Sequence, residues 1–147
     1  MISPALDYCV RLNELGWECD EPNDDNLFRP SKKWLVEFGA YLFRKRPFYK
    51  VEKFDCDNFA AWCVVLATES LLANPSVTNC DHSIIRCTFR VLKGPVLGGT
   101  MRSGKHAASL VWLDEGPIVL FEPQNGQFTD AQGLVTSGII APLLARW

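Results

Sequence analysis

The sequence predicts an α+β fold in which N-terminal helices pack on a small antiparallel sheet. Apolar residues recur at helical spacing in three segments of the first half of the chain. The second half instead carries short runs rich in β-branched and aromatic residues, separated by turn residues. Helices followed by strands, rather than alternating with them, are typical of the α+β class.

Length and composition favour a single domain covering residues 1–147. A chain of this size buries roughly 68–70% of its unfolded surface, enough for a hydrophobic core. With 48% hydrophobic and 22% charged residues, the composition is that of an ordinary globular protein. The core therefore needs neither disulfides nor a metal, and the six cysteines are expected to be thiols.

Three helices are expected, over residues 3–16, 31–44 and 57–72. The first begins at Ser3-Pro4, where a capping residue precedes proline at the first helical position. Ser31 caps the second, and Asn74-Pro75 ends the third. The acidic segment 18–30 between the first two is rich in Asn and Pro and is expected to be a loop.

Strands are expected over residues 83–92, 107–113 and 118–122, the last two joined as a hairpin by residues 114–117. The Gly-rich segment 94–104 is interpreted as a flap over a cleft. A final apolar segment, residues 139–147, fits either a strand or a short helix. Pro142 argues against a central strand there, because proline cannot donate to the ladder.

Charge and hydropathy exclude several partners. The formal net charge of −2 argues against general affinity for nucleic acid or anionic membranes. Charged residues interrupt segment 1–15, so no signal peptide is expected, and no stretch approaches the roughly 20 apolar residues of a membrane span. These observations predict a cytoplasmic protein and do not indicate its oligomeric state.

Cys56 is the candidate nucleophile. It lies at the predicted N-terminus of the third helix, where the helix dipole and unpaired N–H groups favour a thiolate. The same N–H groups can stabilise an oxyanion that forms beside the sulfur. The flanking Asp55 and Asp57 act against the thiolate through their negative charge, unless they cap the helix or bind a cation.

His106 is the candidate base, because it begins a strand directly after the Gly-rich segment. Glu122 ends the next strand, and antiparallel pairing would place it beside His106 to fix the tautomer of the ring. Asn125, in the following turn, is the alternative orienting residue. His82 lies in a polar turn and is expected at the surface.

These motifs occur in an order similar to that of a known family. A D-C-D-x-F-A helix start, a strand-opening histidine and an E-P-Q-N turn resemble the papain-like cysteine peptidases. Within them, the sequence most closely resembles the C-terminal protease domain of the Marasmius oreades agglutinin family, over residues 54–127. The resemblance implies a papain-like fold in which Cys56 is the nucleophile, His106 the base and Glu122 the orienting acid.

The resemblance also implies calcium dependence, which the acidic residues Asp55 and Asp57 support. This sequence departs from the pattern of the papain-like family at the oxyanion hole. Papain-like enzymes often supply a glutamine shortly before the cysteine, yet no glutamine precedes Cys56. The hole would therefore rest on backbone N–H groups or on nearby donors, and the site-lining candidates are Tyr49, Lys50, Lys53 and Asp57.

The function predicted from these residues is a cysteine hydrolase, acting as a peptidase, isopeptidase or amidase through an acyl-enzyme. Its partner would be a peptide or protein substrate, and the residues themselves require no cofactor. The alternative is a catalytically silent binding or inhibitor module on the same fold. The missing glutamine and the two aspartates beside Cys56 favour this alternative.

Overall fold

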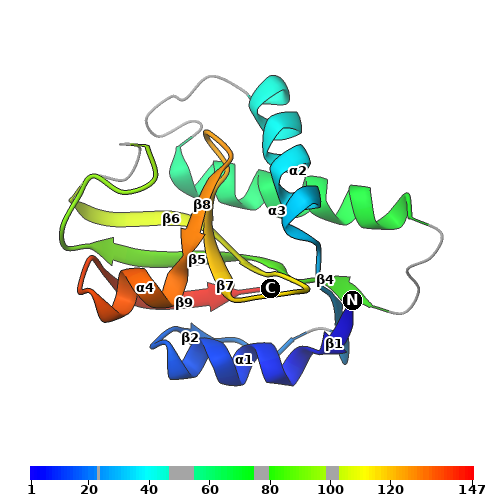
Figure 1. Cartoon of the computed structure of the whole chain (residues 1–147), viewed down its shortest axis with the longest axis horizontal. Helices are drawn as coiled ribbons and strands as arrows, with labels where there is room; N and C mark the ends of the chain where they lie inside the picture. Colours follow the sequence, from blue (N-terminus) through cyan, green and yellow to red (C-terminus); the bar gives the residue numbers. More distant parts are fainter. Residues whose placement is uncertain (23, 47–54, 75–79, 99–102) are drawn as a thin grey trace.

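The structure, a computed structural model, describes all residues except 23, 47–54, 75–79 and 99–102 (Figure 1). Its helices are α1 (Ala5–Glu14), α2 (Lys32–Lys45), α3 (Cys56–Leu72) and α4 (Ala131–Thr136). Its strands are β1 (Ile2–Pro4), β2 (Glu18–Cys19), β3 (Asn26–Phe28), β4 (Asp81–His82), β5 (Ile84–Val91), β6 (Gly104–Trp112), β7 (Ile118–Glu122), β8 (Gln127–Asp130) and β9 (Ile140–Arg146). None of the helices described is both long and apolar enough to cross a membrane.

The described strands form two sheets. The larger has the order β2-β9-β5-β6-β7-β8, and the smaller the order β1-β3-β4. Neighbours are antiparallel except for the parallel pairs β2/β9 and β3/β4. In Figure 1, α2 and α3 lie on one side of the large sheet, and α1 and α4 lie on the other. The large sheet is therefore the middle layer of three.

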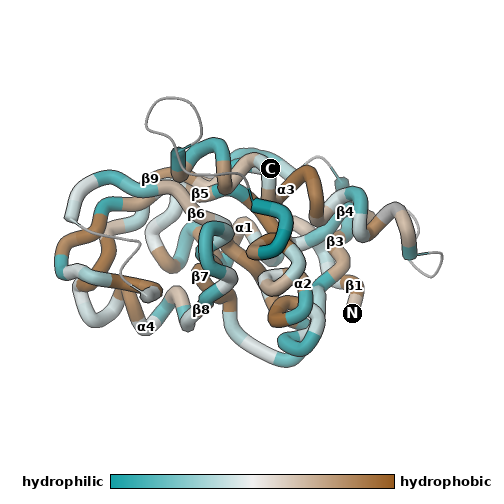
Figure 2. Tube along the Cα trace, turned by 90° about the horizontal axis from the view of Figure 1, so that it is seen from above, coloured by the Kyte–Doolittle hydropathy of each residue, from teal (hydrophilic) through white to brown (hydrophobic). Residues whose placement is uncertain are grey.

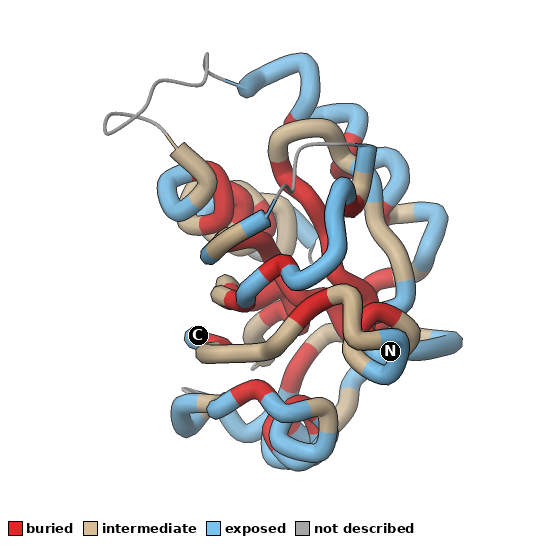
Figure 3. The backbone as a smooth tube through the Cα atoms, turned by 90° about the vertical axis from the view of Figure 1, so that its left-hand side faces the viewer, coloured by how far each residue is buried: buried red, intermediate tan, exposed pale blue. Residues whose placement is uncertain are grey.

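The core on the α1 side is built from alternate residues of β5 and β6. Ile85, Cys87 and Phe89 face the same cluster as Leu12 and Trp17. Figure 2 shows both hydrophilic and hydrophobic stretches along α1, as expected of a helix with one buried face. Buried residues gather in the middle of the molecule, and exposed ones lie toward its outside (Figure 3).

The core on the other side joins α2 and α3 to the sheet. Phe38 of α2 stacks on Phe121 of β7 with ring centroids 6.4 Å apart. This contact depends on a close approach of backbones, because a Cβ on Gly39 would lie 3.0 Å from the carbonyl oxygen of Gly126. Gly126 itself has φ +73°, a conformation that favours glycine. These two glycines therefore bring α2 onto the β7–β8 turn, next to the end of β7.

The three predicted helices are present. However, α1 begins at Ala5 without a side-chain cap, since Ser3 and Pro4 belong to β1, and α3 begins at Cys56, one residue earlier than expected. Ser31 caps α2 by accepting a hydrogen bond from the backbone N–H of Trp34. The hairpin is also confirmed, since β6 and β7 pair antiparallel with Ser109 opposite Phe121. These elements carry local signals, namely apolar periodicity, caps and a tight turn, which the sequence displays directly.

The predicted papain-like arrangement, with helices packed on a small antiparallel sheet, is wrong. The large sheet has six strands and is mixed, and β1, β2 and β3 are interspersed with the N-terminal helices. Strands of two or three residues are too short to show an alternating pattern, so they could not be predicted from the sequence.

The terminal segment is the strand β9, which pairs with β5 on one side and β2 on the other. It accommodates Pro142 because the β5–β9 register shifts between Thr88 and Phe89, and Phe89 faces Pro142. Proline is tolerated at such an irregularity, where the ladder is already interrupted. The sequence argument against a strand at Pro142 therefore fails.

Candidate functional site

Cys56 is the first residue of α3 and is partly exposed. The helix begins here because Asp55 and Asn58 form a capping box: the Asp55 side chain pairs with the Asn58 backbone N–H. In return, the Asp55 backbone N–H donates to Asn58 Oδ1 at 3.2 Å. The charge of Asp55 is thus engaged by the helix end, while Asp57 in the first turn is exposed.

Glu122 lies beside His106. With Ser109 opposite Phe121 in the hairpin, the two side chains share a face of the sheet and are diagonal neighbours. His106 Nε2 and Glu122 Oε2 are 3.0 Å apart. Glu122 has an exposed fraction of 0%, and its Oε1 accepts a hydrogen bond from the Gln124 backbone N–H at 3.0 Å. The carboxylate is therefore held on both oxygens, which fixes the position of the imidazole.

The His106 ring also hydrogen-bonds to Cys56, so the structure brings Cys56, His106 and Glu122 together as one group, the Cys56 group. Burial lowers the pKa of His106, but the hydrogen bonds and charges of Cys56 and Glu122 outweigh it and raise the pKa to about 9. The ring is accordingly a cation at neutral pH. The Cys56 group presents a partly exposed sulfur beside a fixed imidazolium.

Of the other predicted orienting and site-lining residues, the structure describes Asn125 and Asp57. Asn125 does not orient the ring: its Nδ2 donates to the Leu97 carbonyl at 3.0 Å, and its Oδ1 accepts from the Gln127 N–H at 2.9 Å. Tyr49, Lys50 and Lys53 lie outside the described residues.

The described part of the chain contains no group of three His, Cys, Asp or Glu side chains that could hold a metal ion, including at the predicted calcium site. Asp55 is occupied with capping α3, which leaves Asp57 as the free carboxylate of the pair. Calcium at Asp55 and Asp57 stays a prediction.

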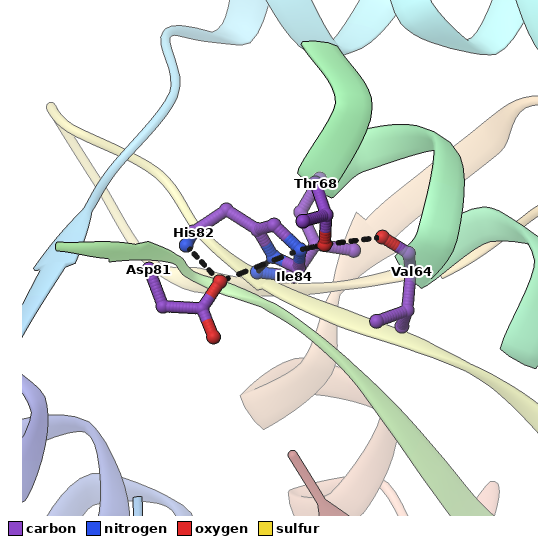
Figure 4. Close-up of polar contacts among 5 residues, drawn as sticks. All are labelled: Val64, Thr68, Asp81, His82 and Ile84. Atoms are coloured by element: carbon purple, nitrogen blue, oxygen red, sulfur yellow. Dashed lines mark hydrogen bonds and ion pairs between the residues drawn. The ribbon is translucent and has the colours of Figure 1, made fainter. Parts of the chain in front are cut away.

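His82 is buried, with an exposed fraction of 5%, and the expectation of a surface residue is wrong. Figure 4 shows its polar contacts. It lies on β4, which pairs with β3 so that His82 is opposite Phe28. The Ile84 backbone N–H donates to His82 Nδ1 at 3.1 Å. Thr68 Oγ1 donates to the Val64 carbonyl at 3.0 Å and lies 2.8 Å from His82 Nε2. The Thr68 hydroxyl has one hydrogen, so Nε2 is the donor to it and the ring is neutral.

These contacts predict a stability loss in acid. Burial lowers the pKa of His82 despite the opposing charge of Asp81, and a second ring proton would break the Ile84 hydrogen bond. Because the folded pKa is below the unfolded value of about 6.5, the stabilisation is full above that pH and is lost as pH falls through the folded pKa. Urea unfolding between about pH 7.5 and 5 should show this loss in the wild type and not in His82→Gln.

Thr68→Val supplies the matched control, since it keeps the shape and removes the hydroxyl. At pH 7.5 it should lower the free energy of unfolding by about 1–3 kcal/mol, because the buried His82 Nε2–H loses the hydroxyl 2.8 Å away as its acceptor. Thr68→Ser should retain most of the stability. Equal acid sensitivity in wild type and His82→Gln would contradict the assignment.

No protein-family model and no curated protein matches this sequence. Solved structures that share its fold include the following two. One is described as a PSL1a–E64 complex, with 14% identity and a TM-score of 0.77, covering 99% of this chain and 51% of that one. The other is the Polyporus squamosus lectin bound to the human-type influenza-binding epitope Neu5Acα2-6Galβ1-4GlcNAc, with 12% identity and a TM-score of 0.75, covering 99% and 49%. The chain thus spans about half the length of each neighbour.

These comparisons correct the predicted family. Their descriptions name a lectin and a complex with E64, and neither names a peptidase. The assignment to the papain-like cysteine peptidases is therefore contradicted, and with it the predicted cysteine hydrolase, its thiol-protease activity and its peptide or protein substrates. The residue order that carried the resemblance covers only half the chain, whereas the fold comparison covers nearly all of it.

Proposed function

We propose that this chain is a binding module, a single domain over residues 1–147 that takes a small polar ligand at the Cys56 group. The observation that carries the proposal is the His106–Glu122 pair, 3.0 Å apart, which holds a cationic ring beside a partly exposed sulfur. Such a pair offers a ligand a fixed positive charge beside a polarisable sulfur. The cytoplasmic location expected from the sequence remains a prediction.

The fold neighbours support a binding role. Both are described as complexes with a small molecule, one with E64 and one with a sialylated trisaccharide. Each description concerns a protein about twice as long as this chain, so either ligand is a probe here and not an assigned partner. Carbohydrate is the ligand class that the second neighbour suggests.

Titration of the chain with E64 and with Neu5Acα2-6Galβ1-4GlcNAc, followed by calorimetry and intact mass, tests the proposal. We expect at least one probe to bind, and Cys56→Ser to weaken it about tenfold or more, a loss of about 1.4 kcal/mol. A ligand mass retained on the wild type and absent from Cys56→Ser would identify the sulfur as a contact.

Cys80→Ser is the matched control, since Cys80 is also a partly exposed thiol but precedes β4, away from the Cys56 group. It should bind as the wild type does. Binding that Cys56→Ser leaves unchanged would place the ligand elsewhere. No binding of either probe would contradict the proposed function for these ligand classes.

A further inference from the structure

A pocket opens over β5, β6 and β9 where α3 begins. Three basic side chains line it, one from each strand: Arg86, Lys105 and Arg146. Thr88 and Asp57 complete the part of the lining that bears on its chemistry, and we call these five residues the basic pocket. Its volume of about 230 Å³ has room for a group the size of a phosphate or carboxylate together with water.

The sheet register places like charges directly opposite one another in this region. Arg86 of β5 faces Arg146 of β9, and Arg90 of β5 faces Lys105 of β6. Like charges in directly opposite positions destabilise a pair of strands. Two such pairs on three adjacent strands concentrate positive charge on one face of the sheet. A bound anion would relieve that repulsion.

The charges nearby offset this repulsion only in part. Arg146 Nε lies 3.8 Å from Asp20 Oδ2, and both side chains are exposed, so the pair is weak. Within the described residues, no carboxylate forms an ion pair with Arg86 or Lys105. Asp57 is the one acidic residue of the basic pocket, against three cations. The basic pocket is therefore positive overall.

Two further features suit an oxyanion. The Thr88 hydroxyl is buried and has no hydrogen-bond partner among the described residues. The basic pocket also meets the first turn of α3, a helix of 17 residues whose N-terminal dipole favours negative charge. Cations and a helix N-terminus thus converge on one small volume, and the lining residue Thr88 carries an unpartnered hydroxyl.

We propose that the basic pocket binds the oxyanion group of a ligand, whether a carboxylate, a sulfate or a phosphate. This site is separate from the Cys56 group, although Asp57 directly follows Cys56 in the chain. It stands whether or not a ligand contacts Cys56. The sequence did not reveal it, because the register that aligns the cations joins strands far apart in the chain.

Titrations with sodium phosphate, sodium sulfate and sodium N-acetylneuraminate, each against sodium chloride at matched ionic strength, test this site. Backbone NMR shifts should saturate for residues of β5, β6 and β9 with at least one oxyanion. Tighter binding of phosphate or sulfate would indicate a tetrahedral group, and tighter binding of N-acetylneuraminate a carboxylate. Arg86→Gln/Arg146→Gln should weaken the apparent Kd at least tenfold.

Unfolding midpoints supply an independent readout. At low salt, Arg86→Gln should unfold at a midpoint equal to or above that of the wild type. Added oxyanions should raise the midpoint of the wild type more than that of Arg86→Gln. Lys45→Gln, an exposed change at the end of α2, is the control and should keep the wild-type Kd within twofold. If the double variant does not fold, Lys105→Gln replaces it, since that side chain is exposed.

Three results would overturn the proposal. One is a double variant, or Lys105→Gln in its place, that binds as tightly as the wild type. Another is a set of wild-type shifts that never saturate and match those caused by chloride. The third is an Arg86→Gln midpoint that falls clearly below the wild type at low salt, which would show that the cation is structural.

Discussion

Replacing Glu122 by alanine is expected to lower the free energy of unfolding by about 3–5 kcal/mol, the range for breaking a buried ion pair. Glu122 has no exposed surface, and its two oxygens accept from His106 and from the Gln124 backbone. Its removal leaves a largely buried imidazolium without its carboxylate. Urea unfolding at pH 7 measures the loss.

Glu122→Gln separates charge from shape. Glutamine fills the same volume and keeps one acceptor oxygen, for either His106 or the Gln124 backbone N–H, so it should cost less than alanine. The variant should also lower the pKa of His106, because the carboxylate charge that helps to raise it to about 9 is removed. NMR can follow this directly, since the chain has only two histidines.

The pH dependence has a definite sign. The folded pKa of His106, about 9, lies above the unfolded value of about 6.5. The stabilisation is therefore full below about pH 6.5 and is lost as pH rises through 9. The wild type should lose stability across this window more steeply than Glu122→Gln. Parallel pH profiles for the two proteins, or a His106 pKa that Glu122→Gln leaves unchanged, would show that the pair is not an ion pair.

The sequence predicted the His106–Glu122 pair because both strands and their turn are contiguous in the chain. Antiparallel pairing across a short turn fixes which residues face each other, so one local pattern places both side chains. The same holds for Cys56, since the capping box that the structure shows at Asp55 and Asn58 lies in the same short segment. Each of these predictions needed information from one short segment.

The features that the sequence did not predict depend on pairing between strands that are far apart in the chain. His82 is buried because β4 joins β3, although neither strand is longer than three residues. Arg86 and Arg146 face each other only because β9 returns beside β5 from the end of the chain. Parallel partners and long-range register have no local sequence signal, so charge and burial at these positions could not be deduced. The predicted cysteine hydrolase was wrong for a related reason, since the order of a few local motifs was used to assign the whole chain to a family.

Trp17→Ala is expected to cost about 3–5 kcal/mol, the range for truncating a fully buried large side chain. Trp17 has an exposed fraction of 1% and lies in the core between α1 and the sheet. Its indole Nε1 also donates to the Thr88 carbonyl at 3.2 Å, beside the point where the β5–β9 register shifts. The side chain therefore fills the core and supports an irregular part of the ladder.

Trp17→Phe separates these two contributions. Phenylalanine keeps most of the buried area but cannot donate to Thr88, so it should lose less stability than alanine, with a hydrogen-bond share of about 1 kcal/mol. Hydrogen exchange should show faster opening of the β5–β9 ladder in both variants, since both lack the indole donor. If Trp17→Phe protects that ladder as well as the wild type does, the indole bond does not support the irregular register, and core packing alone accounts for the loss in Trp17→Ala.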